Sequence, residues 1–170
     1  MAKMLRFTEV IGGRADRAGG GENGVVTLGF EDRRRSRMRI RTDDGREAAL
    51  ILPRGTILRD GDRLRDPEQG AEVTVRAADQ TLSMVHATGA VALARAAYHL
   101  GNRHVPVQVG AGWLAYEHDH VLDDMVEELG LAVETRVAPF EPEAGGYRHG
   151  ESGEGHQHGH HHENGHRHGH

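Results

Sequence analysis

The final segment of the chain, residues 149–170, limits most strongly what this sequence can fold into, because its 22 residues include no apolar side chain. Nine of them are His, six are Gly and three are Glu. A segment with nothing to bury cannot offset the conformational entropy that folding removes, so we expect it to be a disordered His-rich tail. The folded part of the chain then ends near residue 148.

Composition excludes several classes of protein. The 170 residues include no Cys, which rules out disulfides, thiolate metal sites and a cysteine nucleophile. No apolar run approaches the roughly 18 residues that span a bilayer, and the N-terminus lacks the apolar stretch of a secretion signal. The net charge of −5 argues against general nucleic-acid binding. We therefore expect a soluble, cytoplasmic protein with no nucleic-acid partner and no membrane partner.

Residues 1–76 have the pattern of a small β-rich domain. In the segment 37–41, Met38 and Ile40 alternate with Arg, which predicts a strand with one buried face. The pair Asp44-Gly45 favours a tight hairpin turn after this strand. The expected strands of the domain are 25–30, 37–41, 47–52 and 72–77.

The basic run 33–41 has two interpretations. It could bind nucleic acid, or it could be the solvated face of a strand preceded by a basic loop. Acidic residues on both sides of the run and the lack of an interleaved aromatic residue favour the solvated face.

Residues 77–148 have the element order of a ferredoxin-like βαββαβ domain, so the whole chain is expected to be α+β. Four strands are expected, at 80–86, 105–109, 113–117 and 131–137. One helix is expected after the first strand and another after the third. The two helices would cover one face of the sheet and leave its other face bare.

The helix ends are predicted from capping residues. Thr88 is the expected N-cap of the first helix and Gly101 its stop, while Asp119 and Gly130 have these roles in the second. The second helix is also expected to have an apolar face and, on its other side, an acidic face. That face carries Asp123, Asp124, Glu127 and Glu128.

Histidines are the candidate metal ligands, because imidazole suits nickel, copper and zinc. His118 and His120 stand two residues apart, so on an extended segment they would point to the same side and could meet one ion. His104 lies in the loop between a helix and a strand, where a single His more often has a surface role. His86 and His99 are interpreted as structural.

The tail adds nine more candidate ligands. Gly residues between them let the backbone fold around an ion, so we expect the tail to bind several ions loosely. The irregular spacing is unlike the uninterrupted run of a purification tag. The nine residues are His149, His156, His158, His160, His161, His162, His166, His168 and His170.

Three segments combine with this tail into a family pattern. They are Leu52-Pro53-Arg54-Gly55-Thr56, Gly101-Asn102-Arg103-His104 and Tyr116-Glu117-His118-Asp119-His120-Val121-Leu122. With these segments the chain resembles the UreE urease accessory protein family over nearly its whole length. The resemblance implies a nickel metallochaperone and not an enzyme. It also implies a peptide-binding-like domain at 1–76 and a metal-binding, dimerising domain at 77–148.

The resemblance further implies roles for individual residues. His104 and its symmetry mate would hold one Ni(II) at the interface of a homodimer, and His118 and His120 match peripheral metal positions. The implied route is capture by the tail, passage to His104, and delivery to the urease maturation GTPase UreG and the urease apoprotein complex. Zn(II) or Cu(II) could compete for the same nitrogen ligands.

Two other functions stay open. A nickel or zinc buffer would lose nearly all metal binding when the tail is removed, whereas a metallochaperone would keep one tight site per dimer. A metal-dependent hydrolase would use His104, His118 and His120, but no nearby carboxylate has the pattern of a general base.

Overall fold

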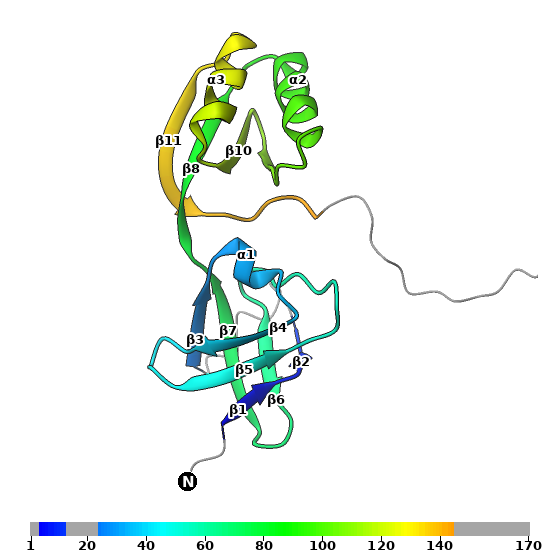
Figure 1. Ribbon diagram of the computed structural model, residues 1–170, viewed down its shortest axis with the longest axis vertical. Coiled ribbons are helices and arrows are strands. Elements are labelled where there is room, and N and C mark those ends of the chain that lie inside the picture. Colours follow the sequence, from blue (N-terminus) through cyan, green and yellow to red (C-terminus); the bar gives the residue numbers. More distant parts are fainter. Residues whose placement is uncertain (1–3, 13–23, 145–170) are drawn as a thin grey trace, which may run out of the picture.

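The computed structural model describes residues 4–12 and 24–144, so the expectations for the tail at 149–170 lie outside the described residues. The described residues form two parts, each with its own sheet structure and core (Figure 1). The expected α+β class is confirmed. Within these residues, no helix is long and apolar enough to cross a membrane.

Two sheets enclose the core of the N-terminal part. One sheet has the strand order β1-β5-β4, formed by Leu5–Phe7, Glu47–Ile51 and Arg37–Arg41. The other has the order β2-β6-β7-β3, formed by Glu9–Val10, Arg63–Asp66, Ala71–Ala77 and Gly24–Leu28. Both sheets contribute buried side chains to one shared core, including Phe7, Val26, Leu50 and Val75.

The strands of the N-terminal part agree only partly with those predicted from the sequence. The alternation predicted for 37–41 is confirmed, since Ile40 is buried, Met38 is half-buried and the intervening Arg residues are exposed in β4. The strand expected at 25–30 ends at Leu28, because Phe30 begins the short helix α1 (Phe30–Arg33). Strands β1, β2 and β6 were not predicted, since they are two to four residues long.

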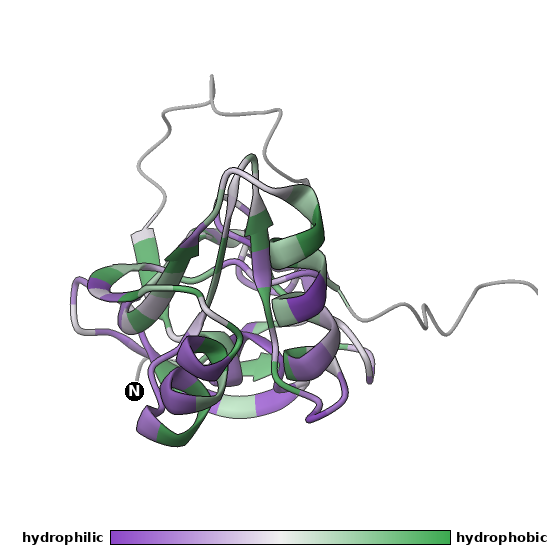
Figure 2. Cartoon of the chain, turned by 90° about the horizontal axis from the view of Figure 1, so that it is seen from above, coloured by the Kyte–Doolittle hydropathy of each residue, from purple (hydrophilic) through white to green (hydrophobic). Residues whose placement is uncertain are grey.

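The C-terminal part is a four-stranded sheet with two helices. Along the chain it contains β8 (Asp79–His86), α2 (Ala90–Gly101), β9 (Gln108–Gly110), β10 (Trp113–Glu117), α3 (His120–Glu128) and β11 (Val133–Pro139). The strand order is β11-β8-β10-β9, and every neighbouring pair is antiparallel. Both helices carry hydrophobic and hydrophilic residues (Figure 2), and their hydrophobic residues pack over Val85, Leu114 and Tyr116 of the sheet.

The helix starts confirm one predicted cap and correct the other. The Asp119 carboxylate caps α3, accepting the N–H of Val121 at 2.8 Å and that of Leu122 at 3.2 Å. The prediction of Thr88 as the cap of α2 is wrong. Helix α2 begins one residue later, after Gly89, with no side-chain cap hydrogen bond.

Two strands are displaced from their expected positions. The strand expected at 105–109 is β9 at 108–110, because the preceding residues complete the turn after α2. The strand expected at 131–137 is β11 at 133–139, which pairs along its whole length with β8.

The sheet face without helices is not bare, contrary to expectation. Phe30 of α1 and Phe140, which follows β11, meet edge to face with their ring centroids 5.6 Å apart. They form one buried cluster with Leu82 and Ala115 of the sheet. The two parts of the protein therefore share a small apolar core at their junction.

Arg33 lies fully buried at the same junction. Its guanidinium donates to the Leu58 carbonyl at 3.1 Å, to the Phe140 carbonyl and to the Glu141 carboxylate. The expectation of a solvated basic run therefore fails for Arg33. A cation in this position connects the N-terminal part to the segment that follows β11.

The rest of the basic run behaves as a solvated face. Arg34 pairs with Glu31 at 2.9 Å, and Arg41 pairs with Glu47 at 3.2 Å, all with exposed side chains. These acidic partners offset much of the local positive charge, which agrees with the interpretation favoured from the sequence.

Candidate metal centre

His104 occupies the turn that ends α2. Its N–H donates to the Gly101 carbonyl at 2.9 Å, and the N–H of Val105 donates to the Leu100 carbonyl at 3.2 Å. These are the two hydrogen bonds of a Schellman motif, which needs a left-handed backbone at the His104 position. The φ angle of His104 is accordingly 57°.

This backbone conformation is normally left to glycine. His104 is the one non-glycine residue with a positive φ among residues 4–12 and 24–144, whereas the predicted stop, Gly101, is the last residue of α2. A left-handed side chain costs roughly 1–2 kcal/mol, and such strain tends to persist where function needs the side chain. The turn leaves His104 exposed at the surface.

The loop that carries His104 borders a pocket of about 400 Å³ between the two parts of the protein. Residues 104–107 contribute to its lining from the C-terminal part, and Phe30 and Arg34 from the N-terminal part. Glu143 also lines the pocket, and its N–H donates to the Val107 carbonyl at 2.8 Å. The chain therefore leaves the described region, toward residue 145, beside the loop of His104.

His118 follows β10 and continues its pairing, since its N–H donates to the Thr81 carbonyl at 3.0 Å. The ring nitrogen Nδ1 lies 3.0 Å from Asp123 Oδ2 and 3.0 Å from Ser83 Oγ. The side chain is 41% exposed. Among the described residues, the second ring nitrogen, Nε2, has no hydrogen-bond partner.

His120 is placed differently. It is the first residue of α3 and is exposed. Asp119, with φ −149° and ψ 121°, is the last residue with an extended backbone before α3 begins. The extended segment that the sequence predicted for both histidines therefore stops before His120. The two rings therefore belong to different local structures, a strand end and a helix start.

The described residues contain no assembled metal cluster. Within 4–12 and 24–144, no group of three or more His, Cys, Asp or Glu side chains could hold an ion. The structure thus does not bring His104, His118 and His120 together into the site that a hydrolase would need. The nine tail candidates, His149 to His170, lie outside the described residues.

Three polar residues that lie around His118 were not predicted from the sequence to belong to the site. They are Ser83, Tyr116 and Asp123. Tyr116 is buried, and its O–H donates to Asp123 Oδ1 at 2.8 Å. Burial raises the pKa of the Tyr116 phenol and the hydrogen bond to Asp123 raises it further, so the phenol keeps its proton.

Asp123 belongs to the acidic face expected for α3, but its side chain is only 16% exposed. Asp123 lies above the end of β10, where it accepts from the Tyr116 hydroxyl and lies 3.0 Å from His118 Nδ1. No local spacing in the sequence indicated this contact, since the cap Asp119 on the same side of α3 is exposed.

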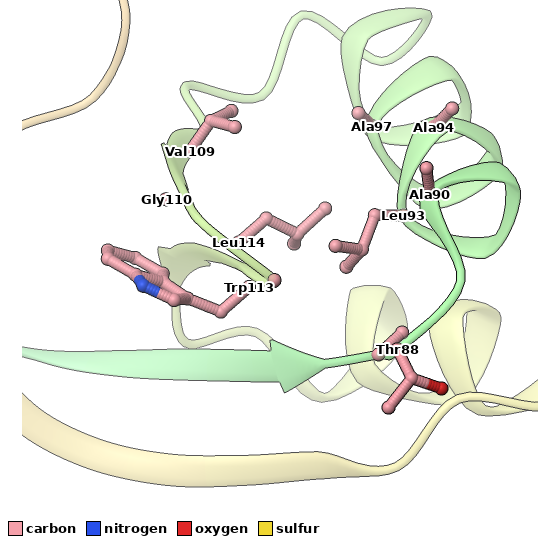
Figure 3. Close-up of a pocket in the computed structure, with 11 residues that line it drawn as sticks. Thr88, Ala90, Leu93, Ala94, Ala97, Val109, Gly110, Trp113 and Leu114 are labelled. Carbon is pink, nitrogen blue, oxygen red and sulfur yellow. The ribbon is translucent and has the colours of Figure 1, made fainter.

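A second pocket, of about 440 Å³, lies between α2 and the hairpin of β9 and β10 (Figure 3). Its lining is almost entirely apolar, with Leu93, Val109, Trp113 and Leu114 as its largest side chains. It contains no imidazole and no carboxylate, so this pocket offers no metal ligands.

Family models identify the class of this α+β chain, which is an accessory protein. The model of the UreE urease accessory protein N-terminal domain matches residues 7–78, and that of the C-terminal domain matches residues 80–170. The chain belongs to the UreE urease accessory protein family.

Curated relatives carry the same name along most of the chain. The urease accessory protein UreE of Pseudomonas putida (strain W619) is 56% identical over 125 residues, which cover 74% of this chain and 78% of the relative. That of Vibrio parahaemolyticus is 47% identical over 160 residues, covering 93% and 100%. The protein is thus an accessory protein and not an enzyme.

Proposed function

We propose that this protein is a nickel metallochaperone, which captures Ni(II) and delivers it to the urease apoprotein and its accessory complex, including the GTPase UreG. Membership of the UreE family supports a role in urease maturation. Nickel is the cargo in this proposal. Zn(II) and Cu(II) are its competitors, because they favour the same imidazole ligands.

The observation that carries the proposal is the position of the tail root, which we define as Pro142 and Glu143, beside the loop of His104. Hydrogen bonds hold Pro142 and Glu143 in place. The Pro142 carbonyl accepts from the Arg59 guanidinium at 2.6 Å, and the Glu143 N–H donates to the Val107 carbonyl. Four residues lie between Ala144 and His149, so the five steps along the chain span at most roughly 18 Å even when fully extended. Tethered imidazoles so close to His104 would be present at high effective concentration.

We assign His104 to the tight site, shared with its symmetry mate in a homodimer. A two-fold axis doubles any ligand that lies close to it, so one exposed imidazole per chain is enough to place two on one ion. Two nitrogens leave coordination positions open for the tail histidines. His118 and His120 are assigned as peripheral ligands that hold ions before or after transfer.

The proposal includes the three domains expected from the sequence, at 1–76, 77–148 and 149–170. The separate cores on either side of residues 77–79 support the first boundary. The strand order β11-β8-β10-β9 with two helices supports a ferredoxin-like assignment for the second domain. A cytoplasmic location, where urease would be assembled, belongs to the same proposal.

Calorimetric titration with nickel tests the assignment on the full chain, on His104→Ala and on a chain ending at residue 148. We expect one tight site per dimer in the full and shortened chains, with the weaker sites of the tail lost on shortening. His86→Ala is the matched control, since it removes another exposed imidazole of the same part. A tight site that survives in His104→Ala would refute the assignment.

A metal buffer remains the second candidate, because nine of the 14 histidines lie in the last 22 residues. Delivery separates the two functions. The nickel-loaded metallochaperone should activate urease apoprotein in the presence of UreG and of a chelator that sequesters free nickel. A buffer should fail under that chelator, however many ions it binds.

A further inference from the structure

The side chains around His118 form a chain of close polar contacts. Tyr116 O–H donates to one oxygen of Asp123, and His118 Nδ1 lies 3.0 Å from the other oxygen. Ser83 stands opposite Tyr116 on the neighbouring strand, and its Oγ also lies 3.0 Å from Nδ1. Both Ser83 and Tyr116 are fully buried, so the chain is anchored in the core and ends at a partly exposed imidazole.

The carboxylate decides which nitrogen of His118 carries the proton. An ionised carboxylate only accepts hydrogen bonds, so a bare Nδ1 lone pair 3.0 Å from Asp123 Oδ2 would be repelled. Protonated Nδ1 instead donates to that oxygen. A neutral imidazole with its proton on Nδ1 has its lone pair on Nε2, the nitrogen without a partner among the described residues.

We propose that Asp123 is a positioning residue, which holds His118 in the Nδ1–H tautomer and thereby presents Nε2 as a ready metal ligand. Metal-binding histidines commonly donate their second nitrogen to a carboxylate, which fixes the ring and its tautomer. This inference rests on the proposed function, because it takes His118 as a ligand of the nickel cargo.

Tyr116 has a second role in this arrangement, since it holds Asp123 in place. Its fully buried hydroxyl donates to Asp123 Oδ1 at 2.8 Å, which fixes the carboxylate beside His118. His120 has no such support among the described residues. The two neighbouring histidines are therefore unequal, with His118 preorganised and His120 free to reorient.

Asp123→Asn separates this role from simple structure. The Tyr116 hydroxyl still needs an acceptor, so the Asn oxygen turns to Tyr116 and its NH₂ group donates to His118 Nδ1. The proton of His118 then moves to Nε2, which removes the lone pair that binds metal. Replacement of Asp by Asn beside a histidine is known to impose the wrong tautomer in this way.

The test uses the full chain, labelled with ¹⁵N in its histidine rings. The His118 signals are identified by their loss in His118→Ala. We expect wild-type protein to have a protonated Nδ1 and an unprotonated Nε2, with Nε2 perturbed when Ni(II) is added. In Asp123→Asn we expect the opposite tautomer, with about 10- to 100-fold weaker nickel binding at His118.

Asp124→Asn is the matched control, because it removes the same charge from the next, exposed position of α3. It should keep both the tautomer and the affinity. An Asp123→Asn protein that keeps the Nδ1–H tautomer, or that changes tautomer without losing affinity, overturns the inference. Wild-type His118 that is unchanged by nickel overturns the ligand assignment of the proposed function itself, and this inference with it.

Tyr116→Phe provides a second variant in case Asp123→Asn does not fold. It leaves Asp123 able to accept from His118, so the tautomer should persist while the carboxylate loses its anchor. We expect a smaller, few-fold loss of nickel affinity at His118. Unchanged affinity would show that the phenol has no part in positioning the ligand.

Discussion

Arg33 and Glu141 form an ion pair that joins the two parts of the protein. Arg33 is fully buried in α1, and Glu141 follows β11 with 20% of its side chain exposed. Burial lowers the pKa of the Arg33 guanidinium, and the Glu141 carboxylate opposes that change. Glu141 also donates its N–H to Gln108 Oε1 at 2.9 Å, so the pair connects α1 to β9 and to the root of the tail.

Removing the cation from this pair should destabilise the protein. Arg33→Met leaves the Glu141 carboxylate partly buried without its main partner, and we expect a loss of about 2–4 kcal/mol, reduced from a fully buried pair by the exposure of Glu141. Urea denaturation measures the change. Arg35→Met is the control, because its pair with Asp32 is exposed and should contribute less than about 1 kcal/mol. Equal losses in the two variants would contradict this account.

His104→Gly should make the protein more stable and less functional. Glycine adopts the left-handed backbone of the Schellman turn without the steric cost of a side chain, so we expect a gain of about 0.5–1 kcal/mol on thermal or urea unfolding. The tight nickel site should be lost in the same variant. A loss of stability would show that the ring makes a packing contribution larger than its backbone strain.

Asp66 should make the N-terminal part sensitive to acid. Burial pushes the pKa of its carboxyl up, but hydrogen bonds from the N–H groups of Arg6, Gln69 and Glu68 outweigh burial and leave the pKa below its usual value. A lowered folded-state pKa stabilises the protein above the unfolded value near pH 4, and this stabilisation is lost as pH falls through the folded value.

We therefore expect Asp66→Asn to lower the free energy of unfolding by about 1–3 kcal/mol at pH 7. The difference from wild type should shrink when both proteins are unfolded by urea at pH 3. Asp79→Asn, at an exposed position, is the control and should show little change at either pH. A difference that is the same at pH 3 and pH 7 would rule out the ionised carboxylate as its source.

The two predicted helix caps should respond differently to alanine. Asp119→Ala removes two hydrogen bonds from the start of α3 and should cost about 1 kcal/mol. Thr88→Ala should be close to neutral, because Thr88 makes no cap bond to α2. Thermal unfolding of both variants measures the contrast, and similar losses would mean that capping is not the cause.

Much of the fold follows from local pattern. Alternation marked β4, the aspartate cap marked the start of α3, and Gly130 adopts the left-handed turn expected after that helix, with φ 84°. Such features depend on residues a few positions apart, so a single sequence is enough to predict them. The strands β1 and β2 were not predicted because they are too short to show a pattern and are held by partners far along the chain.

The candidate histidines could be chosen from the sequence, but the residues that support them could not. Imidazole chemistry and spacing pointed to His118 and His120, whereas the family resemblance pointed to His104. Nothing local indicated that Asp123 turns inward to meet Tyr116 and His118, because that contact depends on how α3 packs over the sheet.

Residue types and their spacing, then, were sufficient for the α+β class and for imidazole as the candidate ligand group, whereas nickel as the cargo and His104 as a ligand came from the family resemblance. Packing alone revealed the buried Arg33, the left-handed His104 and the carboxylate behind His118. Each of these depends on residues from distant segments that meet only when burial pays the entropic cost of bringing them together.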